Sequence, residues 1–297
     1  SSDLIDIVRE AAKSGVHAIK LQTYKPESIT LNIQGGDFEI KDKKSLWYGK
    51  NLYDLYKVGS TPWEWHGEII KEAKKLGLIC FSSPFDEAAV DFLEELDMPA
   101  YKIASFENNH LPLIRKVAST GKPIIISTGM ARLSDIENAV FTAKKAGSKD
   151  IALLKCTSSY PASPKDSNIR TIPNLREIFN CEIGLSDHTK GLGVSIASIA
   201  MGSTIIEKHF TISRSDGGVD SEFSLEPSEM KSLVNETYRA WQSLGKINYG
   251  PTEDETKSLI FKRSIYVAED IKKGDTFDMK NIKIVRPGFG ECPSLYE

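Results

Sequence analysis

A strand-like segment followed by a helix-like segment recurs along most of the chain, and this repetition limits the folds open to it. The strand candidates are residues 17–24, 78–85, 100–107, 123–129, 151–161, 181–189 and 204–210. Each is short, rich in Ile, Leu or Val, and bounded by Gly, Pro or polar residues. Between several of them, as over 63–76, 86–96 and 133–146, apolar residues recur at helical spacing. The pattern predicts an α/β fold with a parallel sheet covered by helices.

These seven units are one short of a closed (β/α)8 barrel, the TIM barrel, which has eight. The chain opens on a helical pattern over 4–12 with no strand candidate before it. We therefore predict a TIM-barrel catalytic domain over residues 1–245, with its first strand upstream of the numbered chain. The alternative is an open, seven-stranded sheet.

The C-terminal part of the chain has a different pattern. A final long helix is predicted over 228–244, with Tyr238 and Trp241 on its apolar face. The polar stretch 246–258 has the composition of a linker. Residues 259–297 form a small separate piece, which must dock on something because about 40 residues bury little core alone. Its predicted strands are 265–267 and 282–284.

Composition excludes several classes of protein. The net charge is −3, with 38 basic and 41 acidic residues interspersed, so we expect no nucleic-acid partner. The longest apolar runs fall far short of the roughly 18 residues that span a membrane, so we expect no membrane partner. The four cysteines are widely spaced and lack metal-finger spacing, which favours reduced thiols and a cytoplasmic location.

Polar residues gather at the C-terminal ends of the predicted strands, where the active site of a parallel barrel lies. Lys20 and Lys102 are each embedded in an apolar strand, and burying an unpaired ammonium group is costly. Together with nearby hydroxyls they predict a site for a small anion that carries phosphate and carboxylate. The alternative is a structural role, in which both lysines pair with Glu107 or Glu207.

Two histidines end consecutive predicted strands, so their rings should be neighbours. His188 and His209, with Asp187 and Glu207 nearby, could hold one divalent ion and leave positions open for substrate and water. Two ligands make a weak site, which favours Mn²⁺ or Mg²⁺ over structural zinc. The alternative is a pair of ordinary hydrogen-bonded histidines.

These segments resemble a known family, the sialic acid synthases, which condense phosphoenolpyruvate with an amino-sugar aldehyde. The matching segments run in order along almost the whole chain: KLQ at 20–22, FSSPFD at 81–86, YKIAS at 101–105, STGM at 127–130, CTSSYP at 156–161, GLSDHT at 184–189, EKHF at 207–210, and Asp220 followed by FSLEP at 223–227. The resemblance implies a TIM barrel followed by a small antifreeze-like (SAF) domain, to which 259–297 is similar.

The resemblance also implies a role for each matching residue. Phosphoenolpyruvate would be bound by Lys20, Ser83, Lys102, Ser105, Ser127, Ser158 and Ser186. His188 and His209 would hold the metal and, with the two lysines, serve catalysis. The sugar would be faced by Gln22, Glu107, Tyr160 and Asp220. The implied reaction joins carbon 3 of the enol to the aldehyde, adds water at carbon 2 and releases phosphate by C–O cleavage.

The chain departs from the family pattern at three places. Ser83 stands where the family commonly has Thr, and Ser158 where it commonly has Asn. The hydroxyl persists at Ser83, whereas Ser158 would bind more weakly or through water. The family's first strand ends in a catalytic glutamate, and no matching segment precedes Ser1.

Within the family, NLYDLY at 51–56 and TPWEW at 61–65 look most like the pseudaminic acid synthases, which use a 2,4-diacetamido-2,4,6-trideoxy-altrose. N-acetylneuraminate or legionaminate synthase is the alternative enzyme, and a non-catalytic sugar-binding relative is the alternative from another class. The resemblance further implies a domain-swapped homodimer in which Arg286 contacts the sugar of the partner subunit.

Overall fold

The computed structural model describes residues 2–43 and 45–296. It contains two compact units, Ser1–Leu244 and Gly245–Glu297. In the described part of the chain, no helix has both the length and the apolar character needed to cross a lipid bilayer.

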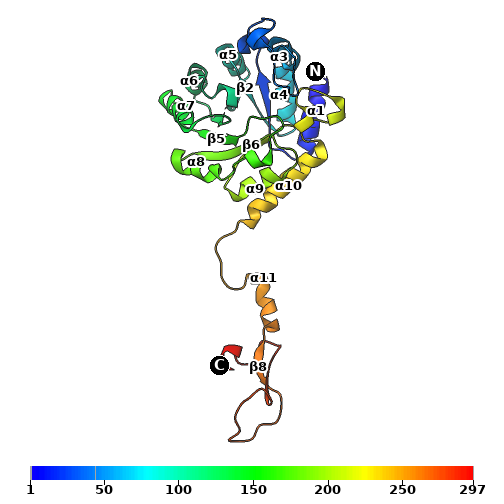
Figure 1. The fold of residues 1–297 in the computed structure, drawn as a ribbon, viewed down its shortest axis with the longest axis vertical. Coiled ribbons are helices and arrows are strands. Elements are labelled where there is room, and N and C mark those ends of the chain that lie inside the picture. The colour runs from blue at the N-terminus through cyan, green and yellow to red at the C-terminus, as the bar shows by residue number, and fades with distance from the viewer. Residues whose placement is uncertain (1, 44, 297) are drawn as a thin grey trace. The chain divides into compact units, whose positions relative to one another are not determined.

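The first unit is built on seven parallel strands that follow one another in sequence order. They are β1 Ala18–Thr23, β2 Ile79–Pro84, β3 Tyr101–Ile103, β4 Ile124–Ser127, β5 Ile151–Cys156, β6 Glu182–Asp187 and β7 Ile206–Lys208. The sheet is curled, with β1 and β7 as its edge strands among the described residues, and Figure 1 shows the helices arranged around it. The predicted α/β fold with a parallel sheet is therefore confirmed.

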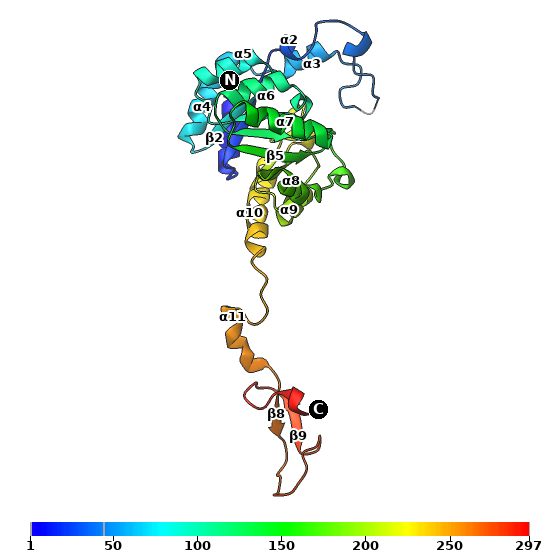
Figure 2. The ribbon, with the colours of Figure 1, turned by 90° about the vertical axis from the view of Figure 1, so that its left-hand side faces the viewer.

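Helices cover the outer face of this sheet, as Figures 1 and 2 show from two directions. The longer ones are α1 Ser2–Lys13, α3 Leu52–Gly59, α4 His66–Lys75, α5 Glu87–Glu95, α6 Leu111–Ser119, α7 Leu133–Lys145, α8 Thr171–Phe179, α9 Gly193–Ala200 and α10 Pro227–Ser243, and α2 Pro26–Ile29 is a single turn. Alternate strand residues such as Ile124, Ile126 and Leu153 point outward and are buried against these helices. The opposite set of side chains points inward, and this set forms the site.

The seven strand predictions match observed strands, and every observed strand is shorter than its predicted range. The prediction over 100–107 was wrong beyond Ile103, because the chain turns into a 3₁₀ helix at Ser105–Glu107. The prediction for the last helix was wrong in part, since Tyr238 and Trp241 are 58% and 60% exposed and stack on each other. They lie beyond the stretch of α10 whose Met230 and Leu233 are buried in the first unit.

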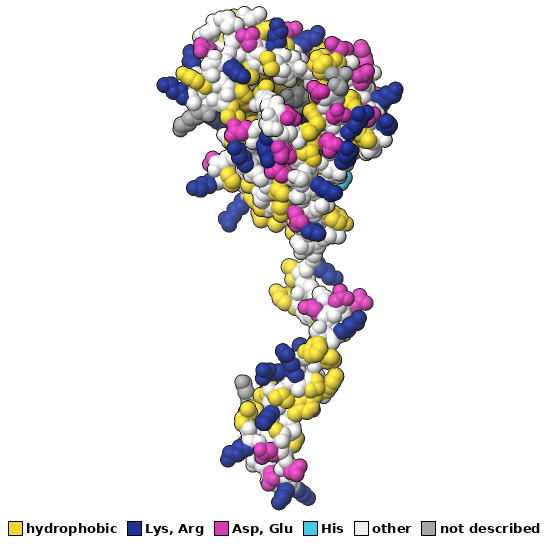
Figure 3. All heavy atoms as spheres, turned by 90° about the vertical axis from the view of Figure 1, so that its right-hand side faces the viewer, with side chains coloured by type: hydrophobic (Ala, Val, Ile, Leu, Met, Phe, Trp, Pro, Cys, Tyr) yellow, Lys and Arg dark blue, Asp and Glu magenta, His cyan; other side chains and the backbone are white. Residues whose placement is uncertain are grey.

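The second unit contains one antiparallel pair of strands, β8 Ser264–Val267 and β9 Ile282–Val285. Both strands lie where the sequence predicts them. A short helix, α11 Glu253–Thr256, begins at a Thr252 capping box within the stretch predicted as linker. Figure 3 shows that, on the face it draws, acidic and basic side chains are interspersed rather than gathered by sign.

Candidate active site

Strand register brings polar residues from β5, β6 and β7 to one layer of the inner face. Cys156 pairs with Ser186, and Ser186 pairs with Glu207. Paired residues on parallel strands project to the same side of the sheet. On the other edge, Gln22 of β1 pairs with Ser83 of β2 in the same way.

Two lysines from distant parts of the chain meet at one carboxylate. The Nζ of Lys20, in edge strand β1, lies 3.1 Å from Oε1 of Glu207, in edge strand β7. The Nζ of Lys102 lies 3.4 Å from the same oxygen, and it donates a hydrogen bond of 2.6 Å to Ser127 Oγ. Ser186 Oγ donates to this oxygen as well, at 2.9 Å. The curl of the sheet is therefore what assembles the cluster.

This cluster holds more positive than negative charge, since two ammonium groups face one carboxylate. Burial lowers the pKa of Lys102 to about 8, although Glu207 opposes the change. Burial acts to raise the pKa of Glu207, but Lys102 and Lys20 outweigh it and hold that pKa well below its usual range. Glu207 thus stays ionised, and below the pKa of Lys102 one unit of positive charge remains unmatched among Lys20, Lys102 and Glu207. The sequence named Glu207 as a partner of both lysines only in the structural alternative, and the structure shows this pairing. No role toward the substrate was predicted for Glu207.

Two buried polar atoms beside the cluster have no hydrogen-bond partner in the described protein. These are the Oγ of Ser83 and the Oε2 of Glu107. Burial raises the pKa of Glu107 to about 7, while the nearby Lys102 opposes the rise. Buried polar atoms are normally paired, so unpaired ones that face a charged site indicate a place for a bound polar group.

Ser105 and Ser158 converge on Gly129, which sequence reasoning did not single out. The backbone N–H of Gly129 donates to Ser105 Oγ at 3.1 Å. A Cβ at position 129 would lie 2.1 Å from Ser158 Oγ and 2.6 Å from Ser105 Oγ, so no side chain fits there. Glycine at the end of β4 was the available signal, because glycine often marks a close approach of backbone.

His188 and His209 are neighbours, with ring centroids 5.3 Å apart. His188 Nδ1 lies 2.9 Å from the carbonyl oxygen of Thr157, which can only accept, so Nδ1 carries the proton and Nε2 keeps its lone pair. His209 Nδ1 lies 3.3 Å from Oδ2 of Asp220. The two Nε2 atoms are therefore the nitrogens free to bind a metal.

Asp187 does not belong with the histidines, and the expectation that it would assist them was wrong. Its side chain faces the helix layer, where Oδ2 lies 2.8 Å from Lys208 Nζ and accepts a 2.6 Å hydrogen bond from Ser195. Within residues 2–43 and 45–296, no group of three His, Cys, Asp or Glu side chains is placed to hold a metal ion. A metal here would take its remaining ligands from water or substrate.

Aromatic side chains form one wall around the histidines. The ring of Tyr160 lies 4.4 Å from that of His188, and Phe223 lies 5.0 Å from His209. The ring centroid of Trp47 lies 6.0 Å from that of Tyr160. Sequence reasoning placed Tyr160 here but assigned no role to Trp47 or Phe223, because the segments that carry them have no strand or helix periodicity.

Gln22 and Arg286 complete the predicted set. Gln22 is partly buried on the inner side of β1, in register with Ser83. Arg286 is exposed in the second unit, directly after β9, and its contact with the sugar of a partner subunit stays a prediction. The roles of all these residues toward phosphoenolpyruvate, sugar and metal are likewise predictions.

Comparison with known proteins gives a consistent result. A pseudaminic acid synthase of Campylobacter jejuni is 42% identical over 98% of this chain and 84% of its own length. An N,N'-diacetyllegionaminic acid synthase of the same species is 35% identical over 98% of this chain and 87% of its own length. A solved N-acetylneuraminic acid synthetase of Leptospira borgpetersenii matches with a TM-score of 0.76 and 31% identity, covering 87% of this chain and 85% of that one.

The family model named NeuB matches residues 7–249, which include every site residue of the first unit named above. The match spans the curled sheet, its helices and the loop that carries Asp220. The chain belongs to the NeuB family.

Proposed function

We propose that the chain is a pseudaminic acid synthase, which condenses phosphoenolpyruvate with 2,4-diacetamido-2,4,6-trideoxy-altrose and releases phosphate. The observation that carries the proposal is the inner-face cluster of Lys20, Lys102 and Glu207, which retains an unmatched positive charge. The 42% identity to pseudaminic acid synthases over 98% of the chain favours this sugar over those of the legionaminate enzymes, which are 35% identical.

Phosphoenolpyruvate is a multiply charged anion, and the cluster provides cations and hydrogen-bond donors for it. Lys20 and Lys102 donate charge-assisted hydrogen bonds, which are about twice as strong as neutral ones. The unpartnered hydroxyl of Ser83 supplies a further donor. The remaining hydroxyls proposed to bind phosphate or carboxylate are Ser105, Ser127, Ser158 and Ser186.

The histidine pair suits a weakly held divalent cation, Mn²⁺ or Mg²⁺. His188 is oriented by the Thr157 carbonyl and His209 by Asp220, so each ring presents its Nε2. When bound, such a cation would polarise the aldehyde oxygen and lower the pKa of water. Asp220 then acts by positioning His209 as well as by facing the sugar.

The reaction forms one C–C bond and one C–O bond to carbon 2, and it breaks the C–O bond to phosphate. Carbon 3 of the enol bonds to the aldehyde carbon, whose oxygen takes up a proton and becomes a hydroxyl. Water adds at carbon 2, and phosphate leaves with the electron pair of its C–O bond, so that a keto group remains. The charge that develops on the phosphate and on the intermediate lies beside Lys20 and Lys102, which stabilise it electrostatically.

The chain's own groups also handle the sugar and its protons. Glu107 has a pKa of about 7, so near neutral pH it can exchange a proton with a sugar oxygen. Tyr160, Trp47 and Phe223 offer an aromatic wall that suits a deoxy sugar with a methyl group and two acetamido groups. Gln22 lies at the opposite edge, on the β1 side of the site.

The second unit is proposed to act in a homodimer. On this proposal residues 259–297 are part of an SAF-like domain, and the partner subunit's Arg286 binds the sugar. The Arg286→Ala variant should show a higher KM for the sugar with little change in affinity for phosphoenolpyruvate. Equal loss of both affinities, or a monomer by analytical ultracentrifugation, would contradict this part.

The test is turnover with a panel of sugars. The protein would be incubated with phosphoenolpyruvate, Mn²⁺ or Mg²⁺ and each candidate aldehyde, and inorganic phosphate and product mass would be recorded. We expect the highest kcat/KM with the 2,4-diacetamido-trideoxy-altrose. A preference for N-acetylmannosamine or the legionaminate precursor would assign those reactions instead, and tight sugar binding without phosphate release would favour a non-catalytic relative.

A further inference from the structure

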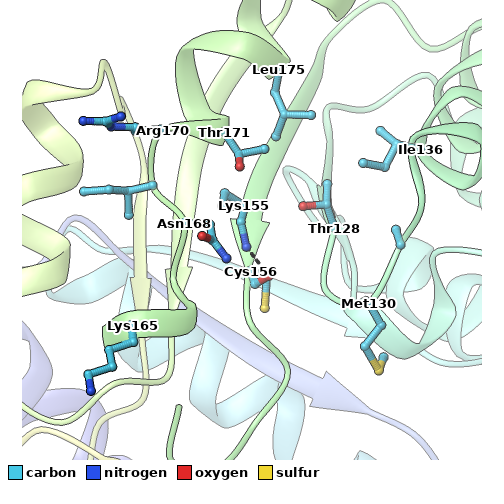
Figure 4. A pocket seen from close by; sticks show the side chains of 12 residues that line it. Thr128, Met130, Ile136, Lys155, Cys156, Lys165, Asn168, Arg170, Thr171 and Leu175 are labelled. Atoms are coloured by element: carbon cyan, nitrogen blue, oxygen red, sulfur yellow. Dashed lines mark hydrogen bonds between the residues drawn. The ribbon is translucent and has the colours of Figure 1, made fainter. Parts of the chain in front are cut away.

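A cavity lies on the outer side of the sheet, between α7 and α8, and the proposed reaction does not use it. Its volume is about 650 Å³, within the usual range for small-ligand sites. The buried residues Ile136 and Leu175 provide apolar surface, and Thr128 lies at the end of β4 (Figure 4). All of its lining belongs to the first unit.

Lys155 projects into this cavity from β5. Figure 4 shows its ammonium near the centre of the view, where Nζ donates a 2.9 Å hydrogen bond to the carbonyl oxygen of Cys156. Among the described residues it forms no ion pair, and burial lowers its pKa. By contrast Lys208, which also points into the helix layer from a neighbouring part of the sheet, is matched by Asp187 at 2.8 Å. Lys155 therefore lies in the helix layer without a carboxylate partner, whereas Lys208 in the same layer has one.

The rest of the lining also favours an anion. Lys165 and Arg170 are exposed at the rim, and no acidic residue lines the cavity in the described chain. Asn168 and Thr171 add an amide and a hydroxyl, and Figure 4 shows both among the side chains around Lys155. Lys155 and the neutral donors, set against an apolar floor, suit a phosphate that is attached to a less polar body. The charged ends of Lys165 and Arg170 point away from Lys155 and add positive charge at the rim (Figure 4).

We propose that this cavity, lined by Lys155, Lys165, Arg170 and Thr171, binds an organic phosphate of nucleotide size. The phosphate contacts Lys155, and the body of the ligand packs on Ile136 and Leu175. The cavity and the inner cluster lie on opposite faces of β5. The side chains of the consecutive residues Lys155 and Cys156 project to opposite sides, and Cys156 Sγ contacts His188 on the inner side. The inference does not depend on the proposed reaction.

Isothermal titration calorimetry with AMP, CMP, GMP and UMP tests the proposal, with the parent nucleosides as phosphate-free controls. At least one nucleotide should bind the wild-type protein with a Kd below about 1 mM. The Kd of the corresponding nucleoside should be higher by at least about tenfold. Lys155→Met should weaken nucleotide binding about tenfold or more. The matched control Lys145→Met removes one exposed charge from α7 outside the cavity and should leave Kd within about twofold.

A second variant protects the test against misfolding of Lys155→Met. Lys165→Gln with Arg170→Gln changes only exposed residues and should raise Kd by about threefold to tenfold. Absence of binding by all four nucleotides would overturn the proposal. Unchanged nucleotide affinity in both variants would also overturn it. So would a loss of nucleotide binding in Lys102→Met together with unchanged binding in Lys155→Met, since that result would place the nucleotide on the inner face.

Discussion

Two buried charge clusters lie on opposite faces of the same sheet, and they are built differently. On the outer face Lys208 pairs with Asp187, both side chains are 1% exposed, and Ser195 and the Thr189 N–H complete the carboxylate's hydrogen bonds. On the inner face two lysines share Glu207, and the neighbouring Ser83 hydroxyl has no partner.

The difference separates structure from function. In the outer cluster the positive charge of Lys208 is balanced by the negative charge of Asp187, so no unpaired charge is left to bind a ligand. The inner cluster lacks one negative charge and at least one hydrogen-bond acceptor, and the proposed substrate, phosphoenolpyruvate, would supply both. Consecutive residues of β7, Glu207 and Lys208, thus serve the two clusters because strand side chains alternate in direction.

The largest expected effect is on stability, from breaking the outer pair. Lys208→Met leaves Asp187 buried without its cation, which should cost about 3–5 kcal/mol of unfolding free energy. Urea unfolding followed by circular dichroism measures it. The matched control is Lys190→Met, which removes an exposed partner of Glu222 and should cost at most about 1 kcal/mol. A loss as small in Lys208→Met would show that the outer pair is not a structural element.

Breaking the inner cluster should instead affect catalysis. Lys102→Met removes a charge that we propose stabilises the transition state, so kcat should fall by about 10²–10³-fold. Its unfolding free energy should fall less than that of Lys208→Met, because Glu207 keeps Lys20 as a partner. Phosphate release and urea unfolding, measured on both variants, check this crossed pattern. If the folded Lys102→Met and Lys208→Met proteins lost activity equally, the inner cluster could not be called catalytic and the outer cluster structural.

Glu107 gives the comparison a pH dependence. Its carboxyl has an ordinary pKa of 4.5 and a pKa of about 7 in the folded protein. Between these values the folded state holds a proton that the unfolded state has released, so this group lowers stability as pH rises. The total loss is roughly 3 kcal/mol above pH 7 and is absent below pH 4.5.

Glu107→Gln should therefore match the wild type in stability near pH 4.5 and exceed it at pH 8. Urea unfolding at both pH values measures the difference. Glu177→Gln, at an exposed position on α8, is the control and should show no such trend. A constant difference between Glu107→Gln and wild type at all pH values would contradict the assignment.

The smallest effect concerns adjacent serines on opposite faces of β2. Ser83→Ala removes an unpartnered hydroxyl, so stability should be unchanged or rise by about 1 kcal/mol while the KM for phosphoenolpyruvate rises about tenfold. Ser82→Ala removes a hydroxyl that lies 2.7 Å from Thr23 Oγ1, so stability should fall by about 1 kcal/mol with KM unchanged. A higher KM in Ser82→Ala and a loss of stability in Ser83→Ala would contradict the assignment of Ser83 to the inner face and Ser82 to the outer face of β2.

Much of this arrangement follows from the sequence, because apolar runs locate the strands and two-residue spacing separates inner from outer side chains. The same rule, applied strictly, would have turned Asp187 outward, since Ser186 and His188 on either side face inward. The sequence offered the pairing of Lys20 with Glu207 only as one alternative, because this contact depends on the curl that brings the two edge strands together. Trp47 was missed because its segment has no periodicity to place it.

The most direct test of the central claim is calorimetric titration of phosphoenolpyruvate alone into four proteins: wild type, Lys20→Met, Lys102→Met and Lys208→Met. Each inner-face variant should lose affinity by about tenfold to a hundredfold, because one charge-assisted contact is removed. The folded Lys208→Met protein should bind as the wild type does. Unchanged affinity in both inner-face variants would contradict the account, since the unmatched charge on the inner face would then have no part in binding the substrate.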